Sequence, residues 1–182
     1  DLAISAPDED VGSIVDAGAV WVLFGSATGL AATGSLAFGQ STISDSESSE
    51  TNDQFGFSLA AGRIDSGSRA DLVIGVPGED GALENSSGKI HVLYNSGSTP
   101  LASEEDWDQS ETGCESTGNE NESGDRFGYA VVVADFDDDG FADVAAGSPF
   151  EDSCFVCGGT PDAGSIHVFT SSSSGLSLSA VD

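Results

Sequence analysis

Positively charged residues are scarce in this sequence. Only four Lys and Arg stand against 32 Asp and Glu, which gives the 182-residue chain a formal net charge of −28. Such a charge repels the phosphates of nucleic acids and of anionic membranes, so we expect neither as a partner. Three settings are compatible with it: high salt, an extracellular matrix rich in divalent cations, or an acidic surface that keeps the protein soluble.

Long apolar runs and catalytic motifs are also lacking. No stretch approaches the run of about 18 apolar residues that a membrane-spanning helix requires, so we expect no insertion into a membrane. No Gly-x-Ser-x-Gly sequence is present, and the Gly-rich turns join strands instead of opening helices. Neither a serine hydrolase nor a phosphate-binding loop is therefore indicated, and we expect the chain not to be an enzyme.

Cysteine is rare, with two of the three cysteines in a Cys-x-x-Cys sequence. A local disulfide between Cys154 and Cys157 suits an extracellular chain and leaves Cys114 free or bridged elsewhere, although Cys114 could also pair with one of the two. Zinc would need further ligands, such as Cys114 with His91 or His167, but both histidines fall inside strand-like Ile-His-Val sequences. The βαβ pattern that accompanies a redox Cys-x-x-Cys is missing.

A regularly spaced group of acidic residues lies at 135–143, which read Asp-Phe-Asp-Asp-Asp-Gly-Phe-Ala-Asp. Carboxylates at positions 1, 3, 5 and 9, with Gly140 at position 6 for a left-handed turn, match the beginning of a calcium loop. Carboxylates this close repel one another unless a cation lies among them, and the alternative is a solvated acidic turn. We expect Ca²⁺ to be bound here by side-chain oxygens and one backbone carbonyl, from Asp135, Asp137, Asp139, Phe141 and Asp143.

The flanks of this loop distinguish it from an EF-hand. Position 12 is Ala146, where an EF-hand has Glu, and helices would be needed on both sides. The segments 129–134 and 143–147 are instead short, and the first is β-branched and apolar. They predict two strands of a hairpin with the metal loop at its tip.

The same stretch occurs more than once. Residues 55–77 align without gaps on 127–149, and residues 1–7 repeat the end of both. After each copy comes a strand with alternating faces and a Ser/Gly turn, at 18–30, 88–101 and 164–176. A third element, an aromatic residue followed two positions later by Gln, occurs at 38–40 and 107–109. Repeats of this length built from short strands indicate propeller blades or a solenoid.

Phe-Gly, then an Asp-rich loop, then Gly-x-Pro resembles the FG-GAP repeat, which is found in the β-propeller of integrin α-subunits and in many secreted proteins. The resemblance covers nearly the whole chain. It implies an all-β fold of four-stranded antiparallel blades, some with Ca²⁺ between their first two strands. The chain holds too few repeats for a closed propeller, so we expect a partial propeller or a segment of a larger one. The expected units are a partial first blade (1–54), a second blade (55–126) and a third blade without a clear outer strand (127–182).

The loop of the second blade, residues 63–71, departs from the metal-binding pattern. Arg63 stands where the third blade has Asp135, and only Asp65 and Asp71 keep their carboxylates. Arg69 lies in the same loop, and our hypothesis is that a guanidinium replaces the cation and pairs with Asp65 or Asp71. The alternative is an empty, exposed loop.

Together these features predict a calcium-stabilised propeller segment of an extracellular or cell-surface protein, with a structural, adhesion or assembly role. Its expected partners are other blades or chains of the same assembly, with a protein or glycan ligand on one rim. Asn85 and Asn121 each begin an Asn-x-Ser sequon and are candidate glycosylation sites. Two alternatives stay open: a repeating unit of a surface filament or layer, and a carbohydrate-binding or accessory module of a secreted enzyme.

Overall fold

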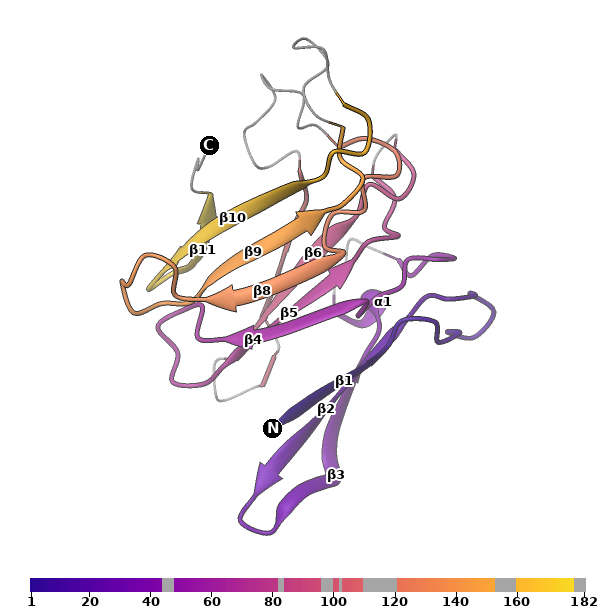
Figure 1. Cartoon of the computed structure of the whole chain (residues 1–182). Coiled ribbons are helices and arrows are strands. Elements are labelled where there is room, and N and C mark those ends of the chain that lie inside the picture. Colours follow the sequence, from indigo (N-terminus) through magenta and orange to yellow (C-terminus); the bar gives the residue numbers. More distant parts are fainter. Residues whose placement is uncertain are drawn as a thin grey trace.

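The computed structural model describes residues 1–43, 48–81, 84–95, 100–101, 103–109, 121–152 and 160–178. Within these residues the fold is all-β, as the repeats predicted, with one short helix, α1 (Gln40–Ile43). The strands form three antiparallel sheets, each with its strands in chain order (Figure 1). No helix in the described part of the chain is long and apolar enough to cross a membrane.

The three sheets are built from similar strands. The first contains β1 (Leu2–Ala6), β2 (Ala19–Ser26) and β3 (Gly29–Phe38). The second contains β4 (Ser58–Gly62), β5 (Asp71–Val76), β6 (Lys89–Tyr94) and β7 (Ser103–Trp107). The third contains β8 (Ala130–Ala134), β9 (Asp143–Ser148), β10 (Ser165–Ser172) and β11 (Gly175–Leu178). The outer strand that the sequence left unclear in the third sheet is therefore β11, which follows the Ser-rich turn after β10.

The second sheet lies between the other two and is covered on both faces. Every residue of β5 is buried, and so is nearly all of β6. In the Ile-His-Val strand, Ile90 and Val92 belong to the cluster shared with the third sheet, and Leu93 belongs to the cluster shared with the first. Because successive side chains of a strand point to opposite faces of the sheet, β6 contributes to the hydrophobic cores on both sides of the second sheet.

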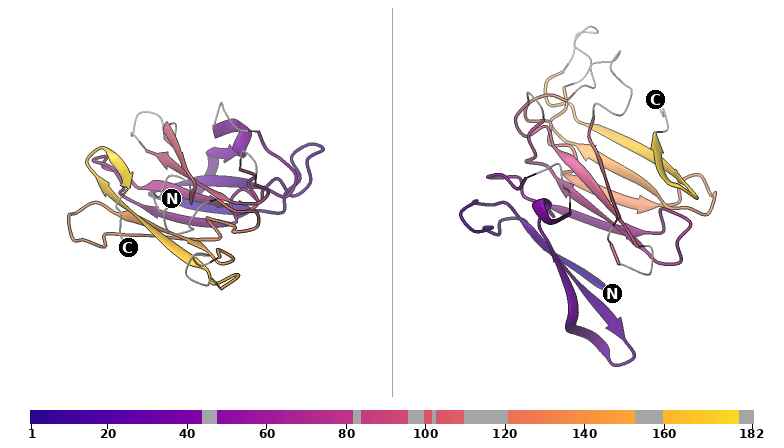
Figure 2. Two further views of the ribbon diagram at one scale, coloured as in Figure 1. Left: turned by 90° about the horizontal axis from the view of Figure 1, so that it is seen from above. Right: turned by 180° about the vertical axis from the view of Figure 1, so that it is seen from behind.

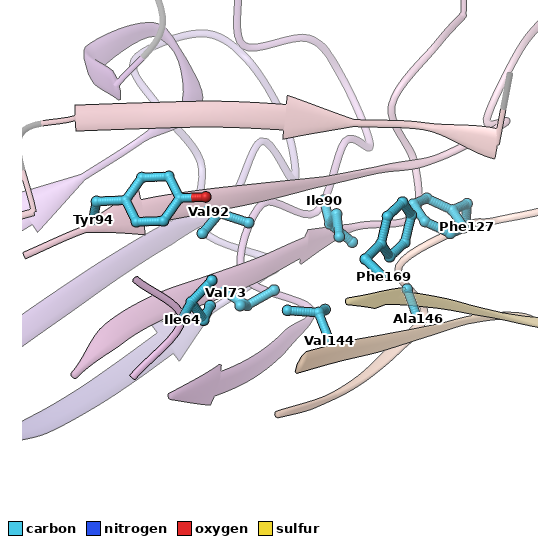
Figure 3. Packing of buried hydrophobic residues seen from close by; sticks show 9 residues of the cluster. All are labelled: Ile64, Val73, Ile90, Val92, Tyr94, Phe127, Val144, Ala146 and Phe169. Carbon is cyan, nitrogen blue, oxygen red and sulfur yellow. The ribbon is translucent and has the colours of Figure 1, made fainter. Parts of the chain in front are cut away.

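Figure 3 shows the core between the second and third sheets. Its side chains come from both sheets and from the segment that joins them: Ile64, Val73, Ile90, Val92, Tyr94, Phe127, Val144, Ala146 and Phe169. The first sheet packs against the others over only part of its length, because the hairpin of β2 and β3 extends away from the other sheets (Figures 1 and 2). Most of β3 is accordingly exposed to solvent.

A Phe-Gly pair lies at each junction between sheets. The N–H of Phe127 donates to the carbonyl of Ser87 (2.8 Å), and Gly128 has a φ of 80°. A Cβ atom on Gly75 would lie 2.0 Å from the Gly128 oxygen, and one on Gly88 would lie 2.3 Å from the Phe127 oxygen. The backbones therefore approach more closely than any residue with a side chain allows. This explains why Phe-Gly and the Gly of Gly-x-Pro recur together in the sequence.

Because the backbone at Gly128 lies so close to Gly75, a methyl group added at Gly75 is predicted to destabilise the fold. We expect Gly75→Ala to lower the free energy of unfolding by about 1–3 kcal/mol, because the new Cβ overpacks the junction. Urea denaturation at constant temperature measures the change.

Gly147 occupies the same repeat position in the third sheet and is the matched control. A Cβ there would lie 3.9 Å from its nearest neighbours, so Gly147→Ala is expected to cost little. Equal losses for the two variants would contradict the prediction.

Candidate metal centre

The acidic loop 135–143 connects β8 to β9, at one end of the third sheet. Residues 135–140 are exposed, Phe141 and Ala142 are half-buried, and Asp143, which begins β9, is buried. Gly140 has a φ of 94° and Asp138 a φ of 63°, so two left-handed residues curl the loop back on itself. The hairpin predicted from the flanking residues is thus the one that forms.

Backbone N–H groups orient the carboxylates of the loop. The Oδ1 of Asp135 accepts from the N–H of Asp139 (3.1 Å) and its Oδ2 from that of Gly140 (2.9 Å). The Oδ1 of Asp137 accepts from the same Asp139 N–H (3.1 Å). The carboxylate of Asp139 instead accepts from the N–H of Phe141 (2.8 Å). Each side chain is therefore held by the turn of the chain around it.

Three of the expected ligands come together in the structure. One oxygen each from Asp135, Asp137 and Asp143 lies within 4.8 Å of the others. Asp139 does not join this group, although it lies in the same loop. An all-oxygen, carboxylate-rich donor set of this kind fits a hard cation such as Ca²⁺, and the carbonyl of Phe141 lies in the loop that would complete the shell.

Asp143 also has a structural role that the sequence did not show. Its Oδ2 accepts from the N–H of Phe136 (2.8 Å) and its Oδ1 from that of Ser171 at the end of β10 (2.9 Å). In the second sheet Asp71 makes the same two contacts, with Ile64 (2.9 Å) and Asn95 (2.8 Å). Burial raises the pKa of Asp71. The Asp at the start of this strand therefore closes the preceding loop in both sheets. It does so in the second sheet even though that loop lacks some of the other metal-binding carboxylates.

The structure corrects the hypothesis that a guanidinium replaces the cation in the second sheet. Among the described residues neither Arg63 nor Arg69 forms an ion pair with Asp65 or Asp71. The Nη2 of Arg63 donates to the carbonyl of Gly140 in the next sheet's loop (2.6 Å), and the Arg63 carbonyl accepts from the N–H of Ala142 (2.8 Å). The reason is geometric: β4 and β8 lie side by side, so Arg63, which follows β4, is placed beside the loop that follows β8 (Figure 1).

A buried carboxyl group that the sequence did not reveal lies between the second and third sheets. Glu151 is 1% exposed and accepts from the side-chain amide of Gln109, which is also buried. Burial raises the pKa of Glu151 to about 8, an effect that the charge of Asp125 strengthens and the Gln109 hydrogen bond opposes. Burial likewise raises the pKa of Asp125 to about 6.

This arrangement occurs twice. At the junction of the first and second sheets, Gln40 donates to Glu79 as Gln109 does to Glu151. In each case the Gln follows the outer strand of one sheet and the Glu follows the Gly-x-Pro of the next. The recurrence of the aromatic-x-Gln element was the signal in the sequence, but its partner lies 39 or 42 residues away and only the fold identifies it.

The other residues singled out in the sequence are distributed as follows. Cys114, Cys154 and Cys157 lie outside the described residues. Asn85 is exposed in a turn, whereas Asn121 is half-buried and its Oδ1 accepts from the N–H of Gln109 (3.0 Å).

Both histidines are buried on their strands and pack against a phenylalanine. The rings of His91 and Phe55 are 5.9 Å apart, and those of His167 and Phe127 are 5.5 Å apart. They act as packing partners of the two Phe-Gly pairs.

Comparison with known proteins identifies the repeat. Residues 127–169 match the family model described as FG-GAP repeat, and this range contains β8, β9, part of β10 and the acidic loop. The search of curated proteins finds no match. The chain therefore contains an FG-GAP repeat, which is a β-propeller repeat that in general binds calcium.

The contact of Arg63 with Gly140 predicts that this side chain orders the acidic loop. In EDTA, we expect Arg63→Gln to speed amide hydrogen exchange at residues 139–142 by roughly three- to tenfold, because a charge-assisted hydrogen bond is lost. Arg69→Gln removes the same charge from the same loop and is expected to leave this exchange unchanged. Equal acceleration in both variants would show a general charge effect instead.

The buried Glu151 predicts a stability that depends on pH. The folded state holds a proton up to a pKa of about 8, whereas the unfolded chain releases it near the ordinary value of 4.5. The unfolded state therefore binds fewer protons between these values, and the free energy of unfolding falls as the pH rises from about 4.5 to about 8.

We expect Glu151→Gln to flatten this slope, as measured by urea denaturation across that pH range. Glu9→Gln is the matched control, because Glu9 occupies the equivalent repeat position in the first sheet but is exposed. A slope that survives in Glu151→Gln would assign the pH dependence to other groups.

Proposed function

We propose that residues 135–143 bind Ca²⁺ and that the bound ion stabilises an integrin-like β-propeller module with a structural, adhesion or assembly role. The observation that carries the proposal is the convergence of oxygens from Asp135, Asp137 and Asp143 within 4.8 Å. Carboxylates held this close by backbone hydrogen bonds repel one another, and a divalent cation removes that repulsion.

The residues of the chain prepare the site before any ion binds. Asp143 is fixed from both sides by Phe136 and Ser171, so one ligand is rigid. Asp135 is fixed by two backbone N–H groups of the loop. Arg63 holds the carbonyl of Gly140 from the neighbouring sheet. A bound Ca²⁺ would supply the positive charge that ties the exposed part of the loop to the buried Asp143.

An extracellular setting suits this mechanism. The net charge of −28 destabilises a compact chain through self-repulsion, and divalent cations or salt reduce that repulsion. FG-GAP repeats are typical of extracellular proteins, which supports the same location. We infer a non-catalytic role, because the roles found for the buried acidic groups are to close loops and to join sheets.

A repeating unit in a surface filament or layer is the second candidate. It is favoured by the exposed apolar side chains on the third sheet, where Val132 is 55% and Ile166 is 76% exposed. Contacts between sheets would cover such a face. A carbohydrate-binding module would place exposed aromatic rings together on one rim, and within the described part of the chain Tyr129 and Phe150, both exposed and with centroids 6.4 Å apart, form such a pair.

Thermal unfolding in EDTA and in excess Ca²⁺ tests the proposal. A Ca²⁺ concentration 100-fold above Kd stabilises the folded state by about 2.7 kcal/mol, which corresponds to a rise in Tm of roughly 5–10 °C for a chain of this size. We expect this rise in the wild type and its loss in Asp137→Asn, which removes one of the three converging carboxylates.

Asp138→Asn is the matched control. Asp138 is the neighbouring residue in the loop and lies outside the converging group, and Asn tolerates its positive φ. The variant loses the same charge and is expected to keep the rise in Tm. A wild type whose Tm is the same in EDTA and in Ca²⁺ would refute the proposal, and equal effects of the two variants would show a nonspecific charge effect.

A further inference from the structure

Residues 121–126 connect separate parts of the junction between the second and third sheets. The Oδ1 of Asn121 accepts from the N–H of Gln109 (3.0 Å), just after β7. The N–H of Gly124 donates to the carbonyl of Asn85 (3.0 Å), in the turn before β6. The segment then leads directly into the second Phe-Gly pair, so its position affects how firmly the third sheet is held against the second.

Two carboxyl groups, which we call the carboxyl pair, meet between this segment and the turn after β9. Asp125 is 2% exposed and Glu151 is 1% exposed. The Oδ2 of Asp125 accepts from the N–H of Glu122 (2.6 Å), and the Oε2 of Glu151 accepts from the side-chain amide of Gln109. The two side chains also form a hydrogen bond with each other. Because a carboxylate has no hydrogen to donate, this bond requires a proton on one of the two groups.

The surroundings of the carboxyl pair assign the proton to Glu151. Its Oε1 is buried and meets no N–H donor among the described residues, so this oxygen is open to protonation. Burial raises the pKa of both groups. Their mutual hydrogen bond raises the pKa of Glu151 further and lowers that of Asp125, as is expected when Glu151 donates and Asp125 accepts.

The charged groups that act on the carboxyl pair are acidic. In addition to burial, the charge of Glu122 raises the pKa of both groups, and the charge of Asp152 raises the pKa of Asp125. Asp162, in the turn before β10, donates its backbone N–H to the Oδ1 of Asp152 (2.8 Å) and adds negative charge on this side. The environment therefore favours retention of the proton.

The nearby positive charge is directed elsewhere. Arg126 follows Asp125 in the chain, but its Cζ lies over the ring of Phe150, 5.6 Å from the centroid. Among the described residues no Lys, Arg or His forms an ion pair with Asp125 or Glu151. Without its proton, the carboxyl pair would hold two like charges in contact at a buried position, which is strongly unfavourable.

The same residue types recur at the junction of the first and second sheets. Asp53 is 1% exposed, and Gln40 donates to Glu79. Asp53 stands two residues before its Phe-Gly pair and Glu79 two residues after its Gly-x-Pro, as Asp125 and Glu151 do. Buried acidic groups at these two positions are therefore part of how the sheets are joined.

We propose that Asp125 and Glu151 share one proton and act as a pH-sensitive latch between the second and third sheets. While the proton is present, the hydrogen bond between them holds residues 121–126 against the turn after β9. When the proton is lost, repulsion between the two carboxylates favours release of this segment, and the Phe-Gly pair that follows is held less firmly. The proposal goes beyond Ca²⁺ binding and does not depend on it.

The pKa values of the two groups define the pH range of the latch. In the closed junction the pKa of Asp125 is raised to about 6 and that of Glu151 to about 8, so the carboxyl pair holds one proton between these pH values. In a released segment the two groups return toward their ordinary pKa values of 3.8 and 4.5 and hold none. Closing therefore takes up one proton, and the closed state loses stability as the pH rises from about 6 to about 8.

Amide hydrogen exchange of the full chain in EDTA tests the latch. The readout is the protection factor of the Phe127 N–H, which donates to Ser87 at the junction and is corrected for the intrinsic effect of pH on exchange. We expect it to fall by about tenfold per pH unit between about pH 6 and about pH 8, because closing takes up one proton. Glu151→Gln, whose amide can donate to Asp125 at every pH, is expected to remove this dependence.

Two further variants distinguish a shared proton from the burial of Glu151 alone. Asp125→Asn offers an N–H to an ionised Glu151 and is expected to reduce the slope to less than about half, which keeps the test valid if Glu151→Gln fails to fold. Glu122→Gln removes a neighbouring negative charge that is not part of the carboxyl pair, and it is expected to retain the slope.

The Phe55 N–H is the internal reference, because it makes the equivalent bond at the first junction, to Ala17 (3.0 Å). We expect Glu151→Gln to leave the pH dependence of this amide as it is in the wild type. Equal changes at Phe55 and Phe127 would overturn the latch, since Glu151 would then set only the overall stability.

Three other outcomes would overturn the proposal. The first is a wild-type protection factor at Phe127 that stays constant across this pH range, and the second is an unchanged slope in Asp125→Asn. The third uses Asp137→Asn, which removes a ligand of the acidic loop: recovery of protection by Ca²⁺ at about pH 8 in this variant would assign a metal ion to the carboxyl pair in place of a proton. Because the other measurements are made in EDTA, their result stands whether or not the acidic loop binds Ca²⁺.

Discussion

The close approach of backbones at the Phe-Gly pairs is the constraint on which the rest of the structure depends. Gly128 passes so near Gly75 that no side chain fits between them. This contact sets the distance between the second and third sheets, and Phe127 then fills the space beside it together with Ile90 and Phe169. At the first junction Phe55 approaches Gly18 as closely as Phe127 approaches Gly88, although Ser5 stands there in place of Gly75. The second sheet is therefore buried on both faces and becomes the centre of the fold.

The same constraint brings the two acidic loops together. With β4 beside β8, the loop at 63–71 lies against the loop at 135–143, and Arg63 reaches the carbonyl of Gly140. A loop that has lost its metal-binding residues therefore still supports the neighbouring loop that has kept them. In a chain with only four Lys and Arg, one guanidinium placed beside this acidic loop offsets part of the repulsion among its carboxylates.

Buried polar groups add a second connection between sheets. Gln40 with Glu79, and Gln109 with Glu151, join the outer strand of one sheet to the turn of the next. A carboxyl group in such a position is easier to bury when it is protonated, which is why the pKa of Glu151 rises to about 8. The junctions thus combine an apolar core near the Phe-Gly pair with a hydrogen bond at the rim. The third sheet also keeps the glycine of its Gly-x-Pro sequence and carries exposed apolar side chains.

The sequence by itself determined the repeating strands, the hairpin at 135–143 and the set of acidic residues, because alternation and spacing along the chain are local properties. It also marked Phe-Gly and aromatic-x-Gln as recurring elements, without showing what they contact. The tertiary structure decided the rest: that Asp139 lies outside the converging oxygens, that Arg63 turns to Gly140 and that Glu151 is buried against Gln109. Each of these depends on which segments from different sheets become neighbours, and the close packing at the glycines settles that in three dimensions.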